Sequence, residues 1–257
     1  MITLSESLVR QTVAVAFLLI TSLVLIRYLS QKRNLKSNSL RYISSLNHLR
    51  WSILRSVEIG KRVHIGLGSA PLVSNRSASA LSGLAAVEKI AQVCATGDFP
   101  PLATSGDGPT TILAQNRLIK IFNKRNISER YRVEFNRYSA SSPWSYAVAT
   151  AADIQDENVS CNILCGNMGS EAGLPLASAE MIDAPTFGGS DSLAGQAVCM
   201  AGAKEPLVGE EVYAIPGYIN LDPVFFASLK TQDVIRMLVI LVLLLGAILE
   251  FLGITVI

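Results

Sequence analysis

Residues 159–174 read VSCNILCGNMGSEAGL, and the fold class depends on this stretch. It begins with a mostly apolar run of strand length, 159–165, which ends in three consecutive apolar residues, 163–165. A glycine-rich turn follows, and residues 170–181 then continue with helical composition. Strands that are apolar on both faces are typical of parallel sheets covered by helices on both sides.

The same order of strand, turn and helix recurs through the middle of the chain. Further strands are predicted at residues 63–67, 101–104, 132–135, 184–187 and 197–200. Helices are predicted at residues 77–94, 110–122, 143–152 and 206–213. This alternation predicts an α/β fold, with a Rossmann-like, mostly parallel sheet and covering helices over residues 61–221.

Both ends of the chain are apolar over lengths that suit a membrane span. Residues 8–26 are uncharged after Arg10, and residues 237–257 contain a single charge, Glu250. A bilayer core requires about 20 apolar helical residues. The sequence therefore predicts transmembrane helices within residues 1–29 and 222–257, and Asp222-Pro223 is a typical helix start from which the second would run unbroken.

Basic residues indicate how the chain is oriented. They collect after the first span and before the second, whereas only Arg10 lies on the other side of either span. The positive-inside rule therefore predicts a cytoplasmic α/β domain with both termini outside.

Residues 30–60 are predicted to form a basic juxtamembrane amphipathic helix. Leu46, Leu49, Ile53 and Val57 recur at helical spacing, and arginines occupy the rest of the wheel. Such a helix either lies on anionic headgroups or packs on its own domain, and the sequence does not separate these interpretations.

Three glycine-rich turns at residues 104–110, 166–173 and 188–195 are the strongest local feature of the domain. In an open parallel sheet such turns gather at the carboxyl edge, where ligands usually bind. The predicted ligand-binding residues are Ser105, Gly106, Asp107, Asn167 and Ser190.

The acids in these turns have a simpler interpretation. Asp107, Glu171 and Asp191 stand where carboxylates cap or stabilise a helix start, and a carboxylate there repels a phosphate. Capping is therefore favoured, and the alternative is a hydrolase that uses Asp107 and Glu171 as its acid pair.

No catalytic residue, metal site or cofactor is predicted. His64 is interpreted as a hydrogen-bonded packing residue, because no partner for a Ser/His or Cys/His system is positioned with it. Cys161 and Cys165, like Cys94 and Cys199, fit buried packing better than a zinc site. The phosphate-binding and nucleophile-elbow motifs are absent from the sequence. With a net charge of +2, nucleic acid is not an expected partner.

Glu250 lies within the second apolar segment, and Gly246 and Gly253 flank it at helical spacing. A buried carboxylate in a span requires a partner, and glycines permit close helix contact. These three residues are therefore predicted to form a transmembrane interface.

Four segments resemble an uncharacterised family of bacterial two-span membrane proteins, known as a domain of unknown function. They are RVHIGLGSAPLVSNRSASALSGLAAVEKIA, PPLATSGDGPTTILAQNRL, NILCGNMGSEAGL and AKEPLVGEEVYAIPGYI. The resemblance implies a bacterial inner-membrane setting and no particular activity.

Three functions remain open. The first is a membrane-anchored structural or assembly protein, a scaffold whose domain self-associates as a homo-oligomer or binds a partner in a larger membrane complex. The second is a sensor that binds a small ligand at the glycine-rich edge, and the third is the membrane-tethered hydrolase. In each the lipid bilayer is an expected partner.

Overall fold

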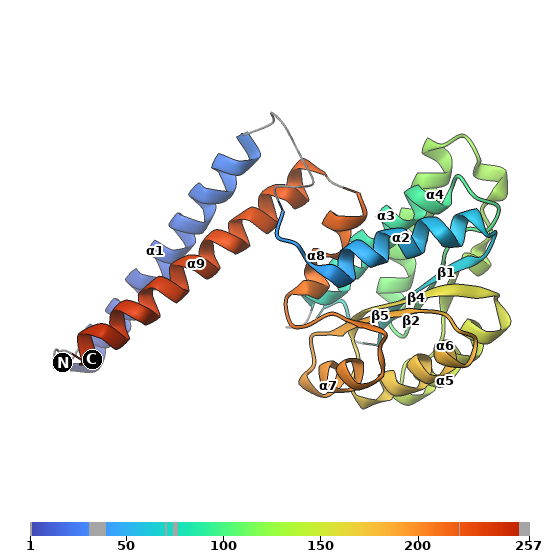
Figure 1. Cartoon of the computed structure of the whole chain (residues 1–257). Helices are drawn as coiled ribbons and strands as arrows, with labels where there is room; N and C mark the ends of the chain where they lie inside the picture. Colours follow the sequence, from blue (N-terminus) through green and yellow to red (C-terminus); the bar gives the residue numbers. More distant parts are fainter. Residues whose placement is uncertain (1, 31–39, 70, 74–76, 221, 252–257) are drawn as a thin grey trace. The chain divides into compact units, whose positions relative to one another are not determined.

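The structure, a computed structural model, describes residues 2–30, 40–69, 71–73, 77–220 and 222–251 (Figure 1). The chain divides into two compact units. One consists of Met1–Arg41 and Leu221–Ile257, and the other is the α/β domain, Tyr42–Asn220.

The α/β domain is built on a six-stranded sheet in which every described pair of neighbouring strands is parallel. The strands are β1 Arg62–Gly68, β2 Leu102–Ser105, β3 Asn136–Tyr138, β4 Val159–Asn167, β5 Thr186–Ser190 and β6 Glu205–Pro206. Their spatial order is β3-β2-β1-β4-β5-β6. The predicted parallel α/β class is confirmed.

This order has one topological switch point. From β1 the chain builds outward through β2 to β3, then returns to place β4 on the other side of β1. The same order, 3-2-1-4-5-6, is that of the dinucleotide-binding Rossmann sheet. The connections after β1 and after β4 therefore leave the sheet toward opposite faces, and sheets of this order bind their ligands at the carboxyl ends of the strands beside that point.

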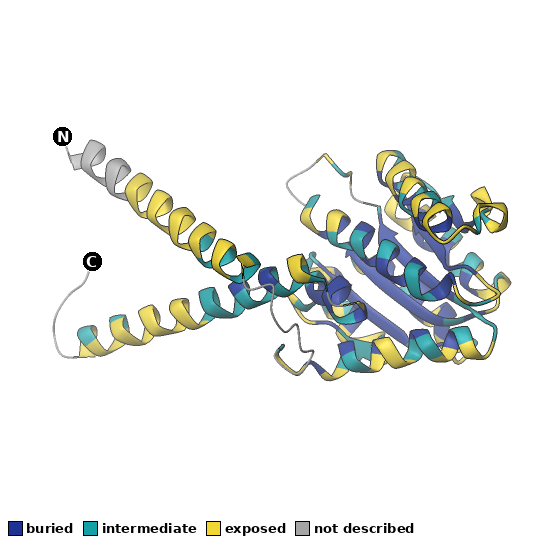
Figure 2. Cartoon of the chain, turned by 90° about the horizontal axis from the view of Figure 1, so that it is seen from above, coloured by how far each residue is buried: buried dark blue, intermediate teal, exposed yellow. Residues whose placement is uncertain are grey.

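Helices cover both faces of the sheet (Figure 1). The helices of one layer are α2 Ser44–Glu58, α3 Ser77–Cys94, α4 Gly108–Lys124 and α8 Glu211–Ile219. The helices of the other layer are α5 Pro143–Asp156, α6 Gly173–Met181 and α7 Leu193–Gly202. Figure 2 shows the strands as a buried sheet between helices whose outward faces are exposed.

Burial explains why the central strands are apolar throughout. Val63–Gly68 in β1 and 161–166 in β4 are buried on both faces, because each strand has a helical layer above and below it. The four described cysteines are buried free thiols, as the apolar runs around them indicated. Burial raises the pKa of Cys165 to about 12 and that of Cys199 to about 11, so these thiols are protonated and unreactive.

Three predicted elements differ from the structure. Residues 132–135 contain a 3-10 turn, Val133–Phe135, and pairing with β2 begins only at Asn136. Residues 197–200 are helical: they lie in α7, whose buried residues Gly195 and Cys199 are four apart, as on one helix face. Pro206 pairs with Gly188 in β6, so the last helix of the domain begins only at Glu211.

The other unit contains two long helices, α1 Ile2–Ser30 and α9 Pro223–Phe251. Arg10–Ser30 and Pro223–Phe251 are both long and apolar enough to cross a membrane. The helices contact each other, and Ala227 and Thr231 of α9 are buried. A small cavity of about 200 Å³ there is lined by Thr21, Ser22, Leu25, Ser228, Thr231 and Gln232.

The carboxyl ends of β1 and β4 approach too closely for any side chain. A Cβ atom built on Gly166 would lie 2.1 Å from the carbonyl oxygen of Leu67. One built on Gly68, whose φ of +76° favours glycine, would lie 2.3 Å from the carbonyl oxygen of Asn167. Here β4 also carries an extra residue, since Gly66 pairs with Leu164 but Gly68 with Asn167.

We expect Gly166→Ala to destabilise the domain by about 3 kcal/mol, because its methyl group overlaps a backbone oxygen that cannot move without separating the strands. Gly108→Ala is the matched control, since a Cβ at Gly108 has nothing within 4 Å. Urea unfolding of the full chain in detergent, followed by tryptophan fluorescence, measures both variants. Equal stability of the two would contradict the close approach of β1 and β4.

Candidate functional site

The turns that follow four neighbouring strands form one hydrogen-bonded row along the carboxyl edge of the sheet. The amide of Gly106, after β2, donates to the Gly68 carbonyl of β1 at 2.9 Å. The amide of Ser69 donates to the Asn167 carbonyl of β4 at 3.3 Å, and the Asn167 side chain donates to Asp191 after β5. The structure thus brings the three predicted turns together, with the β1 turn at the centre.

Ser190 joins the β5 turn to the β4 turn. Its Oγ donates to the Met168 carbonyl at 2.6 Å and accepts from the amides of Met168 and Ser192 at 3.0 and 3.2 Å. The side chain is fully buried. Its hydrogen-bonding capacity is used within the turns, so Ser190 positions the edge.

Asp107 caps α4. Its Oδ2 accepts from the backbone amide and hydroxyl of Thr110 at 3.0 and 2.7 Å, and from the amide of Leu72 at 3.2 Å. Ser105 Oγ in turn accepts from the Asp107 amide at 3.1 Å. Asp107 therefore also ties the turn after β1 to the start of α4.

The other two acids are likewise engaged locally. The amide of Gly169 donates to Glu171 Oε1 at 2.7 Å, and Glu171 is buried. Asp191 accepts from the Asn167 side chain. Among the described contacts, Asp107 and Glu171 share no hydrogen-bond partner, so the geometry offers no support for an acid pair. The ligand-binding assignment of this edge stays a prediction.

The turn directly after β1 was not among the turns singled out from the sequence. It starts at Gly68-Ser69 beside Asn167, at the switch point, and α3 has no acidic residue in its first turn. The signal is HIGLGS (64–69), an apolar strand that ends in two closely spaced glycines. Only the strand order, with β4 beside β1, distinguishes this turn from the others.

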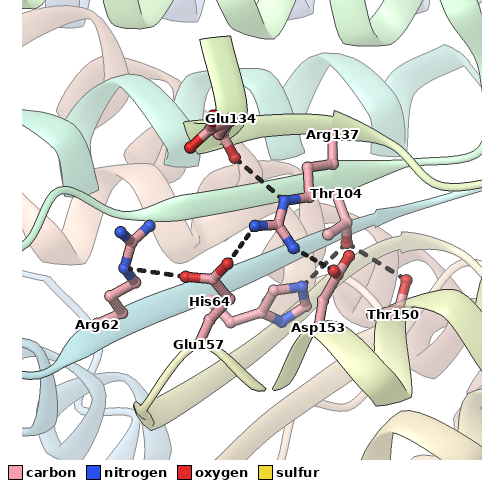
Figure 3. A network of polar contacts seen from close by, with 8 residues as sticks. All are labelled: Arg62, His64, Thr104, Glu134, Arg137, Thr150, Asp153 and Glu157. Carbon is pink, nitrogen blue, oxygen red and sulfur yellow. Dashed lines mark hydrogen bonds and ion pairs between the residues drawn. The ribbon is translucent and has the colours of Figure 1, made fainter. Parts of the chain in front are cut away.

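A buried chain of hydrogen bonds runs beneath this edge, between the sheet and α5. His64 Nδ1 donates to Asn162 Oδ1 at 2.7 Å, because an amide oxygen can only accept. His64 Nε2 then accepts from Thr104 Oγ1 at 2.9 Å (Figure 3). Asn162 continues the chain to Thr186 of β5 through its Nδ2, at 3.2 Å.

The chain also reaches the switch point. The Tyr146 hydroxyl, on α5, lies 3.4 Å from Thr104 Oγ1 and accepts from the Gly68 amide at 3.2 Å. Tyr146 and Thr104 are fully buried. Side chains from β1, β2, β4, β5 and α5 are therefore linked in one network that ends at the backbone of Gly68.

An ion-pair cluster borders the network and holds β3 to α5 (Figure 3). Arg137 of β3 binds both Asp153 and Glu157. Arg62 of β1 also pairs with Glu157, at 3.4 Å. Burial raises the pKa of Asp153, although Arg137 counteracts this. Since the cluster lies at the rim of the layer, we assign it to positioning α5.

His64 is a structural residue here. Both ring nitrogens are engaged and the side chain is fully buried. Burial lowers the pKa of His64 to about 4, the hydrogen bond with Asn162 opposes this, and the charge of Arg137 adds to it. The interpretation of His64 as a hydrogen-bonded packing residue is confirmed.

Two cavities of the domain lie away from the glycine-rich turns. One, of about 470 Å³, is at the amino edge, between the ends of α6 and α7, and Glu180, Asp183 and Lys204 contribute to its lining. The other, of about 340 Å³, lies between α2, the end of α3 and the end of α8, and Arg50 and Arg125 contribute to its lining.

A family model described as "Domain of unknown function (DUF6754)" matches residues 5–257. The chain belongs to this family. The match covers both apolar helices as well as the α/β domain, so the family is defined over the two units together. No curated protein and no solved structure shows a significant match to the chain.

Lowering the pH should destabilise the domain through His64. Its unfolded pKa is 6.5 and its folded pKa about 4, so between these values the unfolded chain binds a proton that the folded chain does not. The contribution of neutral His64 to the free energy of unfolding is therefore fully present above pH 6.5. It decreases as the pH falls toward 4, by about 3 kcal/mol in total.

We expect His64→Gln to reduce the pH dependence of the free energy of unfolding in that window by up to about 1.4 kcal/mol per pH unit, whatever its effect on absolute stability. Urea unfolding at several pH values measures the slope. His48→Gln, which removes the other, exposed histidine, should retain the contribution of His64. An unchanged slope in His64→Gln would refute the assignment.

Proposed function

We propose that this protein is a membrane-anchored assembly protein whose α/β domain self-associates through the carboxyl edge of its sheet. The observation that carries the proposal is the composition of that edge. Its polar side chains are hydrogen-bonded within the turns, while large apolar side chains around it are exposed: Val73 by 90%, Leu193 by 84% and Tyr138 by 52%. Exposed apolar groups of this kind favour contact with another protein surface.

The topology places these three side chains on the same edge. Val73 follows β1, Tyr138 ends β3 and Leu193 begins α7. In a parallel sheet every connection from a strand to the next helix leaves from the carboxyl end. An apolar rim around hydrogen-bonded turns suits a flat protein partner better than a small polar ligand.

The long helices support anchoring and association in the bilayer. In α9 only Ala227 and Thr231 are buried among the described residues, so the apolar surface of 237–251 is left for lipid or another chain. Gly246 has open space around its Cβ position and Glu250 is exposed, as an interface with a second copy requires. Gly253 lies outside the described residues.

The setting of the protein is part of the same proposal. The basic residues around both apolar segments support a cytoplasmic domain with both termini outside. The bacterial inner membrane rests on the resemblance of the sequence segments.

We expect the full chain in mild detergent to be a homo-oligomer, and Leu193→Glu combined with Val73→Asp to shift it toward monomer, because both changes place charge in an apolar contact. Mass photometry measures the particle mass. Met181→Glu is the matched control, since Met181 is 78% exposed but ends α6 at the opposite edge. A monomeric wild-type chain with no co-purifying subunit would contradict the proposal.

The strand order favours a second candidate function. Sheets of order 3-2-1-4-5-6 bind dinucleotides at the carboxyl ends of the strands beside the switch point, which here lies between β1 and β4. Ser69 and Asn167 lie at this switch point, beside Gly68. This supports a sensor domain that binds a nucleotide or a similar phosphate-bearing small molecule.

A nucleotide present at one hundred times its Kd should stabilise the domain by about 2.7 kcal/mol. This corresponds to a rise of roughly 5–10 °C in unfolding temperature for a domain of this size. Thermal unfolding of the full chain with NAD and ATP tests the idea. Ser69→Asp should abolish any shift, because it places a carboxylate at the switch point, whereas no shift in the wild type rules out these two ligands.

A further inference from the structure

The two halves of the α/β domain's sequence carry net charges of opposite sign. Residues 42–135 contain twelve lysines and arginines against six acids. Residues 136–220 contain two basic residues against ten acids. The net charge of the whole chain, +2, does not reveal this separation.

The separation follows the two helical layers. Helices α2, α3, α4 and α8 lie on one face of the sheet and contribute six basic residues against three acids. Helices α5, α6 and α7 on the other face contribute three acids and no basic residue. The basic layer and the acidic layer are therefore opposite faces of one sandwich.

The basic layer is also the layer through which the chain enters and leaves the domain. Its first helix, α2, begins at Ser44, and its last, α8, ends at Ile219. Only Asn220, Leu221 and Asp222 stand between α8 and the start of α9 at Pro223. Each connection to an apolar helix thus starts from this layer.

Helix α2 has two distinct faces. Its apolar face is used inside the domain, where Leu46, Leu49 and Ile53 are buried. Its outer face exposes Trp51, by 72%, together with Arg55. An amphipathic aromatic ring beside arginines is typical of a surface in contact with lipid headgroups.

The cavity of about 340 Å³ adds a recess to this layer. Arg50 and Arg125 line it together with Asn220, and its other lining residues are Ile53, Leu54, Gln92, Val93, Thr96 and Ile219. No carboxylate is among these lining residues. Arg125 is held in place by a 3.2 Å hydrogen bond from Nη2 to the Gln92 carbonyl. Two guanidinium groups in a recess whose lining includes no carboxylate suit a phosphate-bearing headgroup.

We propose that the α2–α3–α4 layer is a docking surface for anionic lipid headgroups. Arg50, Arg125 and Arg55 contact the phosphates, and Trp51 enters the headgroup region. The inference goes beyond self-association at the carboxyl edge and rests only on the membrane anchoring proposed above. The acidic layer then faces away from the bilayer, because anionic lipids repel it.

The two tryptophans of the chain provide a direct test, since each reports one layer. Trp51 is on α2, and Trp144, also exposed, is on α5. The full-length variants Trp144→Phe and Trp51→Phe leave one reporter each. Both are reconstituted in nanodiscs of phosphatidylcholine with or without phosphatidylglycerol, and brominated lipids serve as quenchers.

We expect quenching of Trp51 to rise at least about twofold when phosphatidylglycerol is present and to fall with added salt, while quenching of Trp144 stays low in both discs. Arg50→Glu combined with Arg125→Glu, in the Trp51 reporter, should abolish the rise. Lys204→Glu is the control, because Lys204 is exposed and lies between α7 and β6, away from the basic layer.

Three results would overturn the proposal. Similar quenching of both tryptophans shows that neither layer is preferred. Protection of Trp51 that depends on protein concentration and not on lipid charge shows that the basic layer binds the acidic layer of another copy. Absence of Trp51 quenching in a chain that inserts refutes docking alone, whereas a chain that does not enter discs refutes anchoring as well.

Discussion

The close contact between β1 and β4 is the constraint on which the domain depends. Leu67 and Gly166 meet backbone to backbone, and the buried His64–Asn162 hydrogen bond joins the same two strands. This contact joins the two halves of the sheet at its topological switch point. It also fixes Gly68, whose amide bonds to Tyr146 and whose carbonyl accepts from Gly106. The layout of the glycine-rich edge therefore follows from one pair of strands.

Elements that depend on local composition could be predicted from the sequence. Elements that depend on which strand pairs with which were predicted less well. The apolar runs of β1 and β4 predict strands because burial on both faces requires such composition. The apolar residues at 197–200 satisfy the same criterion, yet they form one face of α7. Strand β6 has two residues, Glu205 and Pro206, and exists only because β5 offers a free edge beside it. Its partner is distant in sequence, so no local pattern reveals it.

The same distinction applies to the candidate site. The convergence of the turns at Ser105, Asn167 and Ser190 could be expected from parallel topology alone. The individual hydrogen bonds between the turns could not be expected from topology. Ser190 bonds to Met168 in another turn, and Asp107 accepts from the backbone amide of Leu72. The β1 turn was overlooked because its importance comes from the strand order. The charge separation is visible in the sequence, but its division between two layers requires the fold.

One consequence of the two connections concerns mechanics. The α/β domain is inserted in the sequence between α1 and α9, so it is connected to an apolar helix at each of its ends. Both junctions, before α2 and after α8, belong to the same layer. A force applied to the opposite layer, for instance by a bound partner, is therefore transmitted to both connections. Because only Asn220, Leu221 and Asp222 separate α8 from α9, such a force would reach a helix of membrane-spanning length after three residues of chain.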